Sequence, residues 1–382
     1  MMGGYFTEKD CNIDQFLTLI SEKIDPSSLK FAENLEHNIP IYSNHTVVST
    51  LANPTTRRQL MTEWASVISE LSGALVVKGA ISDLQMLEEV TELFNEIIIK
   101  EKAENSGGDH FGEKGANDRV WNSLQKLCIQ NPNLFSRYFS SIALAAVCEA
   151  WLGPWYQMTS QVNLVRPGGK AQTCHRDYHL GFMTPKQAEN FPKHTHLLSM
   201  SLTLQGAIAH CDMPIESGPT KLLPNSQRYS AGYIATLLPS FRQIFEENYI
   251  QIPLEKGDML FFNPALFHAA GENKSENIQR MANLLQISSP MGRSLERIDR
   301  TSMVEALYPA IKELNLTGGE RAAVIAAAAE GYPFPTNLDT DPPVGGLASE
   351  SQAELLNRAL NENMSEDDFQ IALHNNNSKR LP

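Results

Sequence analysis

The stretch KGDMLFFNPALFHAAGENKSENIQR, residues 256–280, carries the pattern that decides the fold and the chemistry. Lys256-Gly257-Asp258 predicts a turn, and the apolar run Met259–Phe262 predicts a buried strand after it. His268 follows a second short apolar run. The Gly- and Asn-containing segment beyond His268 predicts another turn, and Arg280 then opens a further strand. A hairpin of this length returns Arg280 to the neighbourhood of His268.

Short apolar runs bounded by Gly, Pro and Asn continue upstream of this stretch. The runs are Gln161–Val165, Leu197–Ala209, Lys221–Leu223, Ile250–Leu254, Met259–Phe262 and Asn283–Ile287. Helical periodicity precedes them, from Thr56, from Ser82 and over Phe135–Leu152, and returns over Met303–Leu314, Glu320–Ala329 and Gln352–Leu360. Strands between two helical regions predict an α+β fold with a mainly β core, built as an antiparallel sandwich or barrel with flanking helices.

The same pattern divides the chain into three parts. Residues 1–54 are loosely patterned, and we expect them to wrap the surface. Residues 55–293 form the main domain, helices first and then the β core at 155–290. Residues 294–382 form a C-terminal helical extension with a flexible tail after Asn375. The Gly-rich segment 105–118 is long and polar for a connection between helices, and it predicts a mobile lid over the site.

Composition excludes several classes of protein. The 382 residues are 42% hydrophobic and 20% charged, as in ordinary globular domains, and the net charge is −13. An acidic balance argues against nucleic acid or an anionic membrane as a partner. The five cysteines are odd in number, widely spread and without a Cys-x-x-Cys pair, which is typical of reduced intracellular proteins. With no secretory signal and no apolar run of membrane-spanning length, we expect a cytoplasmic protein.

Two His-x-Asp triplets occur, at His175–Asp177 and at His210–Asp212. With ten histidines and 44 acidic residues, roughly one such triplet arises by chance, so the triplet alone is compatible with a solvated surface turn. Context distinguishes the two. The first follows a predicted strand and a Pro-Gly-Gly turn, and an apolar strand comes after it. The second lies at the end of that strand beside a turn, which favours a loop position.

Two histidines and one carboxylate on one face of a metal leave three open positions, the arrangement used for non-haem Fe(II) and dioxygen. On an extended strand, residues two apart point to the same side, so His175 and Asp177 can bind one ion. His268 supplies the third ligand from a distant strand. Arg280 can form a forked contact with a dicarboxylate that also chelates the metal. Taken singly, His268 could be a core histidine and Arg280 a surface ion-pair partner; their joint placement favours the metal site.

The segments CHRDYH, ESGPTKLLPNSQR and residues 256–280 resemble the phytanoyl-CoA dioxygenase family of Fe(II)/2-oxoglutarate oxygenases. The resemblance covers mainly residues 73–289. It implies a double-stranded β-helix, or jelly roll, with His175, Asp177 and His268 as catalytic metal ligands. It also implies that Arg280 binds 2-oxoglutarate, with further polar contacts from Gln161 and Asn163.

The chain departs from the family pattern at several positions. Arg176 stands between the two proximal ligands, where Gln is frequent. Ala270 stands two residues after His268, where a hydroxyl side chain is common. The extension after Arg293 lies outside the family core. Because Asp177 is present, halogenation, which needs that carboxylate replaced by chloride, is not expected.

The resemblance implies that a small organic molecule is oxidised, most simply hydroxylated, while 2-oxoglutarate and dioxygen are converted to succinate and CO2. Desaturation, ring closure and epimerisation use the same cofactors and stay open alternatives. A jelly-roll protein that binds a ligand without catalysis is an alternative of another class. A CoA thioester is not favoured as substrate, because no basic cluster for its phosphates is apparent.

Overall fold

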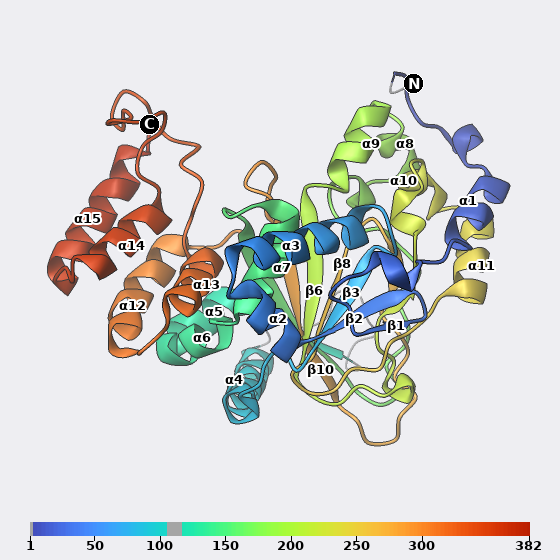
Figure 1. The fold of residues 1–382 in the computed structure, drawn as a ribbon, viewed down its shortest axis with the longest axis horizontal. Coiled ribbons are helices and arrows are strands. Elements are labelled where there is room, and N and C mark those ends of the chain that lie inside the picture. The colour runs from blue at the N-terminus through green and yellow to red at the C-terminus, as the bar shows by residue number, and fades with distance from the viewer. Residues whose placement is uncertain (1–2, 105–116) are drawn as a thin grey trace.

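The computed structural model describes residues 3–104 and 117–382. Within them, an eight-stranded sheet runs in the order β1-β2-β3-β8-β6-β10-β5-β4, antiparallel throughout except between β2 and β3 (Figure 1). Its strands are β1 (Asn34–Glu36), β2 (Ile39–Ser43), β3 (Ala74–Lys78), β4 (Asn117–Val120), β5 (Gln157–Val165), β6 (Thr203–Ala209), β8 (Met259–Phe262) and β10 (Arg280–Ser288). A second sheet pairs β7 (Lys221–Leu223) with β9 (Phe267–Ala269). The fold is therefore mixed α/β with a large, mainly antiparallel sheet, as the sequence pattern predicts.

Helices surround the sheet on several sides (Figure 1). The first group is α1 (Ile13–Ile20), α2 (Asn44–Leu51), α3 (Pro54–Ser69), α4 (Leu84–Ala103), α5 (Ser123–Gln130), α6 (Pro132–Phe139) and α7 (Ile142–Leu152). Four helices come between β5 and β8 in the sequence: α8 (Pro185–Ala188), α9 (Lys193–Ser199), α10 (Gly232–Ala235) and α11 (Pro239–Asn248). The C-terminal group is α12 (Arg300–Glu313), α13 (Gly318–Ala328), α14 (Gln352–Asn361) and α15 (Glu366–Lys379).

Strand alternation gives the main sheet two different faces, because successive side chains point to opposite sides. On β10, Met281, Leu285 and Ile287 join the large apolar core formed with α3 to α7, α12 and α13. Ala282 and Leu284 point the other way, toward the residues between the main sheet and the β7–β9 sheet. These helices thus cover one face of the main sheet, while the other face lies toward the β7–β9 sheet and lines the cavity described below.

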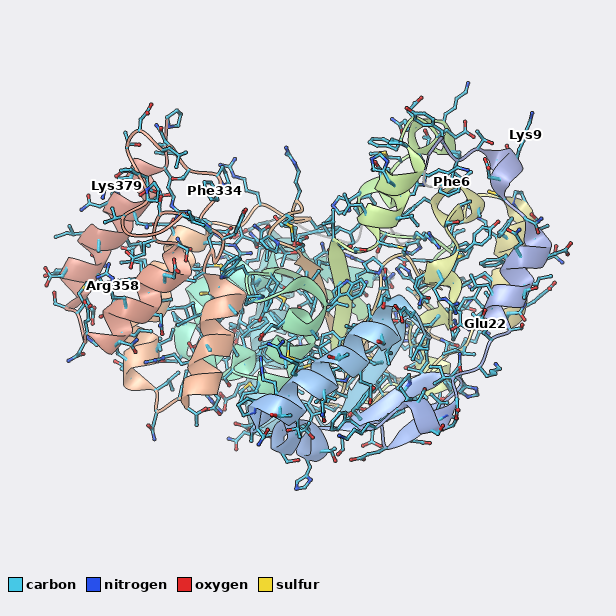
Figure 2. All side chains as sticks on the ribbon, turned by 45° about the horizontal axis from the view of Figure 1, so that its top comes forward. Phe6, Lys9, Glu22, Phe334, Arg358 and Lys379 are labelled. Atoms are coloured by element: carbon cyan, nitrogen blue, oxygen red, sulfur yellow. The ribbon has the colours of Figure 1, made fainter. Side chains whose placement is uncertain are left out.

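The two ends of the chain lie on opposite sides of the molecule. Figure 2 shows Phe6 and Glu22 on one side, where Phe6 packs edge-on against His196 of α9. Arg358 and Lys379 lie on the other side, in the C-terminal helices. Residues 1–54 do more than cover the surface, because β1 and β2 extend the main sheet beside β3.

Three local expectations are wrong. The segment 135–152 is not one helix, because α6 ends and α7 begins anew with Ser141 as its N-cap. The apolar run 197–209 is not all strand, since its first residues close α9 before β6 begins. The tail after Asn375 is not irregular, because α15 continues to Lys379. Amphipathic periodicity alone did not locate these breaks, which depend on caps and tertiary contacts.

Candidate metal centre and co-substrate pocket

The segment 175–177 is held against the segment that leads into β9. The N–H of His175 donates to the carbonyl of His268 at 3.0 Å, and the N–H of His268 donates to the carbonyl of His175 at 3.2 Å. The N–H of Asp177 donates to the carbonyl of Pro264 at 3.0 Å. These main-chain bonds bring two segments that are distant in sequence into one fixed arrangement.

His175, Asp177 and His268 converge, and one ligand atom from each lies within 4.8 Å of the others. His175 Nε2 is 3.6 Å from Asp177 Oδ1, and His268 Nε2 is 3.5 Å from Asp177 Oδ2. Each imidazole places Nδ1 2.8 Å from a backbone carbonyl, that of Thr173 or that of Leu266. A carbonyl only accepts, so Nδ1 carries a proton, and Nε2 is the nitrogen left to bind a metal. This donor set fits a divalent first-row metal, and iron in particular.

The chain turns sharply after Asp177. Tyr178 and His179 have φ values of 67° and 44°, a left-handed conformation that side chains other than glycine rarely adopt. Such a residue costs roughly 1–3 kcal/mol and persists where surrounding contacts fix it. Here the Tyr178 hydroxyl donates to Gln286 Oε1 at 2.7 Å, deep in the protein. The turn thereby directs Asp177 toward the histidines while the next residue is tied to β10.

A glutamine network holds the Asp177 carboxylate. Gln205 on β6 donates through Nε2 to Asp177 Oδ2 at 2.5 Å and lies 3.1 Å from Gln286 Oε1 on β10. Burial would raise the pKa of Asp177, but His175, His268 and the Gln205 bond together hold it well below its usual range. The carboxylate therefore stays ionised, as a metal ligand must.

A cavity of about 540 Å³ opens in front of these three side chains, a size ordinary for small-molecule sites. Alternate residues of β10, from Arg280 to Gln286, form its floor. Gln161 and Asn163 of β5 both line it, in register with Leu284 and Ala282. Apolar walls come from residues of several segments, namely Trp121, Phe182, Met213, Leu254, Phe262, Leu284 and Leu295.

Arg280 lies at one end of this floor and is 8% exposed. One guanidinium nitrogen, Nη1, donates to the carbonyls of Ser217 and Gly271, each at 3.2 Å. Burial lowers the pKa of Arg280 to about 10, so it remains a cation near neutral pH. Within the described ranges no acidic side chain forms an ion pair with it. A buried cation facing a cavity without an anionic partner fits a ligand carboxylate.

Several cavity residues were not identified from the sequence. Gln205 and Gln286 point inward because strand alternation places them there, and only the pairing of β6 with β10 makes them neighbours. Arg119 of β4 donates to Gln161 Oε1 at 2.9 Å. Thr220 lies one position before the Lys221–Ala269 pair, opposite Ala270, so a hydroxyl is available beside the alanine noted above.

The second triplet lies elsewhere. His210 follows β6 but is buried, with Nδ1 2.8 Å from Thr91 Oγ1 and Nε2 2.8 Å from Tyr138 Oη. It packs under the helices and does not line the cavity. His210 therefore lies just beyond the end of β6, as expected, although it is buried, and the choice between the two triplets agrees with the geometry. Of the expected lid, residues 105–116 lie outside the described residues, and Asn117 and Asp118 belong to β4.

Two imidazoles and one carboxylate beside an antiparallel sheet form the donor set of non-haem Fe(II) oxygenases. A family model described as "Phytanoyl-CoA dioxygenase (PhyH)" matches residues 69–282, more than half of the chain. The chain belongs to this family, as the resemblance in its motifs implies.

Individual relatives are more distant. The chain is 25% identical over 140 residues to "Dioxygenase andF" of Emericella variicolor, covering 35% of this chain and 43% of that one. It is 26% identical over 169 residues to "Iron/alpha-ketoglutarate-dependent dioxygenase ausU" of Aspergillus calidoustus, covering 41% and 51%. The match thus spans about half or less of these curated relatives. The solved epimerase SnoN of nogalamycin biosynthesis has a TM-score of 0.41 at 16% identity, covering 62% of this chain and 84% of that one.

Proposed function

We propose that the protein is an Fe(II)/2-oxoglutarate-dependent dioxygenase that hydroxylates a small organic substrate, with release of succinate and CO2. One observation carries the proposal. Two imidazole Nε2 atoms and the Asp177 carboxylate converge at a cavity whose floor also carries the buried Arg280, which has no acidic partner among the residues that the structure describes. If the histidines had only a structural role, the buried Arg280 on the floor of the same cavity would have no purpose.

Each residue has a separate task in this proposal. His175, Asp177 and His268 hold the iron, and their Nδ1 and Gln205 contacts fix the orientation of the ligand atoms. Arg280 binds the distal carboxylate of 2-oxoglutarate, with polar contacts from Gln161 and Asn163. Bound iron and 2-oxoglutarate together supply the activation of dioxygen.

The rest of the cavity receives the organic substrate. Trp121, Phe182 and Leu295 line the cavity and would bury its hydrocarbon part and exclude water. We also propose that the two sheets are the two layers of a jelly roll, with residues 55–293 as the oxygenase domain and 294–382 as an extension. The pairing of β7 with β9 opposite the main sheet supports this assignment.

The test is iron stoichiometry together with succinate formation from 2-oxoglutarate. Wild-type protein should bind one Fe(II) and form succinate, and the Ala variants of His175, Asp177 and His268 should lose both. Asp212→Ala is the matched control, since Asp212 belongs to the second triplet, is exposed and accepts a bond from the Lys256 N–H. Equal turnover in Asp177→Ala and Asp212→Ala would refute the ligand assignment.

The reaction outcome needs a separate measurement. A panel of organic compounds is screened for those that increase succinate formation, and the masses of the products are measured by mass spectrometry. Hydroxylation adds one oxygen atom to the substrate. Loss of two hydrogens would instead indicate desaturation or ring closure, and an unchanged mass with altered stereochemistry would indicate epimerisation.

A further inference from the structure

The side chain between the two proximal ligands has an unusual environment. Arg176 is 2% exposed, and its Nη2 donates to three backbone carbonyls. These belong to Ser226 at 2.6 Å, Gln227 at 3.3 Å and Tyr229 at 2.9 Å. This guanidinium thus binds the loop that follows β7, on the opposite side of the ligand segment from the His175 and Asp177 side chains.

Aromatic rings and a glycine complete the enclosure of this guanidinium. Its central carbon lies 5.0 Å from the ring of Tyr233 and 5.2 Å from the ring of Phe267, the residue before the third ligand. A Cβ at Gly232 would be 2.0 Å from the same carbon. The absence of a side chain at Gly232 therefore makes room for the cation.

This cation has no acidic partner within the described ranges, although burying a charge is costly unless dipoles or an opposite charge compensate. Burial lowers the pKa of Arg176 only to about 10, so the group stays charged. Three carbonyls and two ring faces provide the compensation. Such an arrangement is costly for filling a core, where an apolar side chain would suffice, so it points to a further role.

We propose that Arg176 is a positioning residue of the metal centre, which ties the ligand pair His175–Asp177 to the loop 226–229. This inference rests on the proposed function. The ligand segment is held on one side by its main-chain bonds to Pro264 and His268. Arg176 adds a side-chain link from the same segment to the loop 226–229. The same loop is joined to β9, because Phe267 N–H donates to Ser226 Oγ at 2.8 Å.

Two effects of Arg176 on metal affinity have opposite signs. Its fixed geometry reduces the reorganisation needed on metal binding and so favours binding. Its positive charge repels a divalent cation and so opposes binding. Arg176→Gln removes both effects, whereas Arg176→Lys keeps the charge and loses the planar fork. Comparing the two variants separates geometry from charge.

The experiment measures Co(II) binding to the full chain by calorimetry and the visible absorption of bound Co(II), which reports coordination geometry. If geometry dominates, Arg176→Gln and Arg176→Lys both bind Co(II) about 10–100-fold more weakly, with altered spectra. Arg300→Gln is the matched control. Arg300, at the start of α12, also donates to three backbone carbonyls, those of Met158 on β5 and of Ala327 and Ala328 on α13. The Arg300→Gln variant should therefore be less stable than the wild-type protein but bind Co(II) with the same affinity.

The outcomes separate this inference from the proposed function. Wild-type affinity and spectrum in Arg176→Gln, or tighter binding, would overturn the positioning role while leaving the proposed function intact. If Arg176→Gln does not fold, Arg176→Lys decides by the same criterion. Failure of the wild-type protein to bind either Co(II) or Fe(II) would overturn the proposed function and, with it, the role of Arg176.

Discussion

His175 and His268 are joined by reciprocal main-chain hydrogen bonds, in an antiparallel bridge that attaches the ligand segment to β9. The bridge sets the imidazole ring centroids 4.5 Å apart. Because both rings also fix Nδ1 on local carbonyls, the separation of their Nε2 atoms is decided before any ion binds. The ligand site is therefore largely preorganised, which lowers the cost of metal binding.

Gln205→Leu should weaken the metal site. The change removes the donor to Asp177 Oδ2 and frees the carboxylate to rotate. Loss of a hydrogen bond to a metal ligand typically lowers metal affinity or activity about 10–100-fold. Iron affinity and succinate formation are the measurements, with Gln243→Leu as control, because Gln243 lies exposed on α11 and bonds only Glu247 among the contacts described. Unchanged affinity in Gln205→Leu would show that Asp177 needs no such support.

Arg280→Ala should raise the KM for 2-oxoglutarate while Fe(II) still binds. The lost contact is a charge-assisted pair in a largely desolvated pocket, worth roughly 2–5 kcal/mol in binding. The KM is measured by succinate formation over a range of 2-oxoglutarate concentrations. Arg166→Ala is the control, since Arg166 pairs with Asp118 and does not line the cavity. A larger rise in Arg166→Ala would transfer the anchor to that residue.

His210 should make the fold acid-sensitive. Burial lowers the pKa of His210 to about 3, and Thr91 Oγ1 already donates to Leu87, so the neutral ring donates through Nδ1 and accepts from Tyr138. Between the unfolded pKa near 6.5 and the folded value, the unfolded state binds one more proton. The stabilisation is thus present above about pH 6.5 and is lost as pH falls toward 3.

The measurement is urea unfolding of wild type and His210→Gln at several pH values. Between about pH 6 and pH 4, the difference in unfolding free energy should shrink by up to about 1.4 kcal/mol per pH unit. Taking the difference between the two proteins cancels the pH-dependent contributions that the other histidines make to the unfolding free energy of both. A pH-independent difference would mean that His210 does not titrate between these states.

Chelation should lower the thermal stability of the metal-loaded protein. A metal that binds only the folded state, at a free concentration 100 times its Kd, adds about 2.7 kcal/mol. Melting curves with Co(II) and with excess EDTA should therefore differ for the wild-type protein and coincide for His268→Ala. A similar difference in His268→Ala would place the stabilising ion elsewhere.

Local pattern in the sequence was enough for much of this protein. Alternating and continuous apolar runs predicted the strands at 161–165, 259–262 and 283–287, and helical periodicity predicted the helix from Thr56, which is α3 in the structure. The spacing of His175 and Asp177 placed both on one side of the chain. These features depend on residues a few positions apart, and such spacing is a property of the chain itself.

The tertiary structure decided the relationships between distant segments. Gln205 reaches Asp177 only because β6 pairs with β10 and the ligand segment crosses in front of them. His210 became a core residue because α4 and α6 bring Thr91 and Tyr138 to it. The sequence by itself determined the ligand types, their local spacing and the order of the elements. Which side chains meet depended on long-range strand pairing and helix packing, whose register no short pattern specifies.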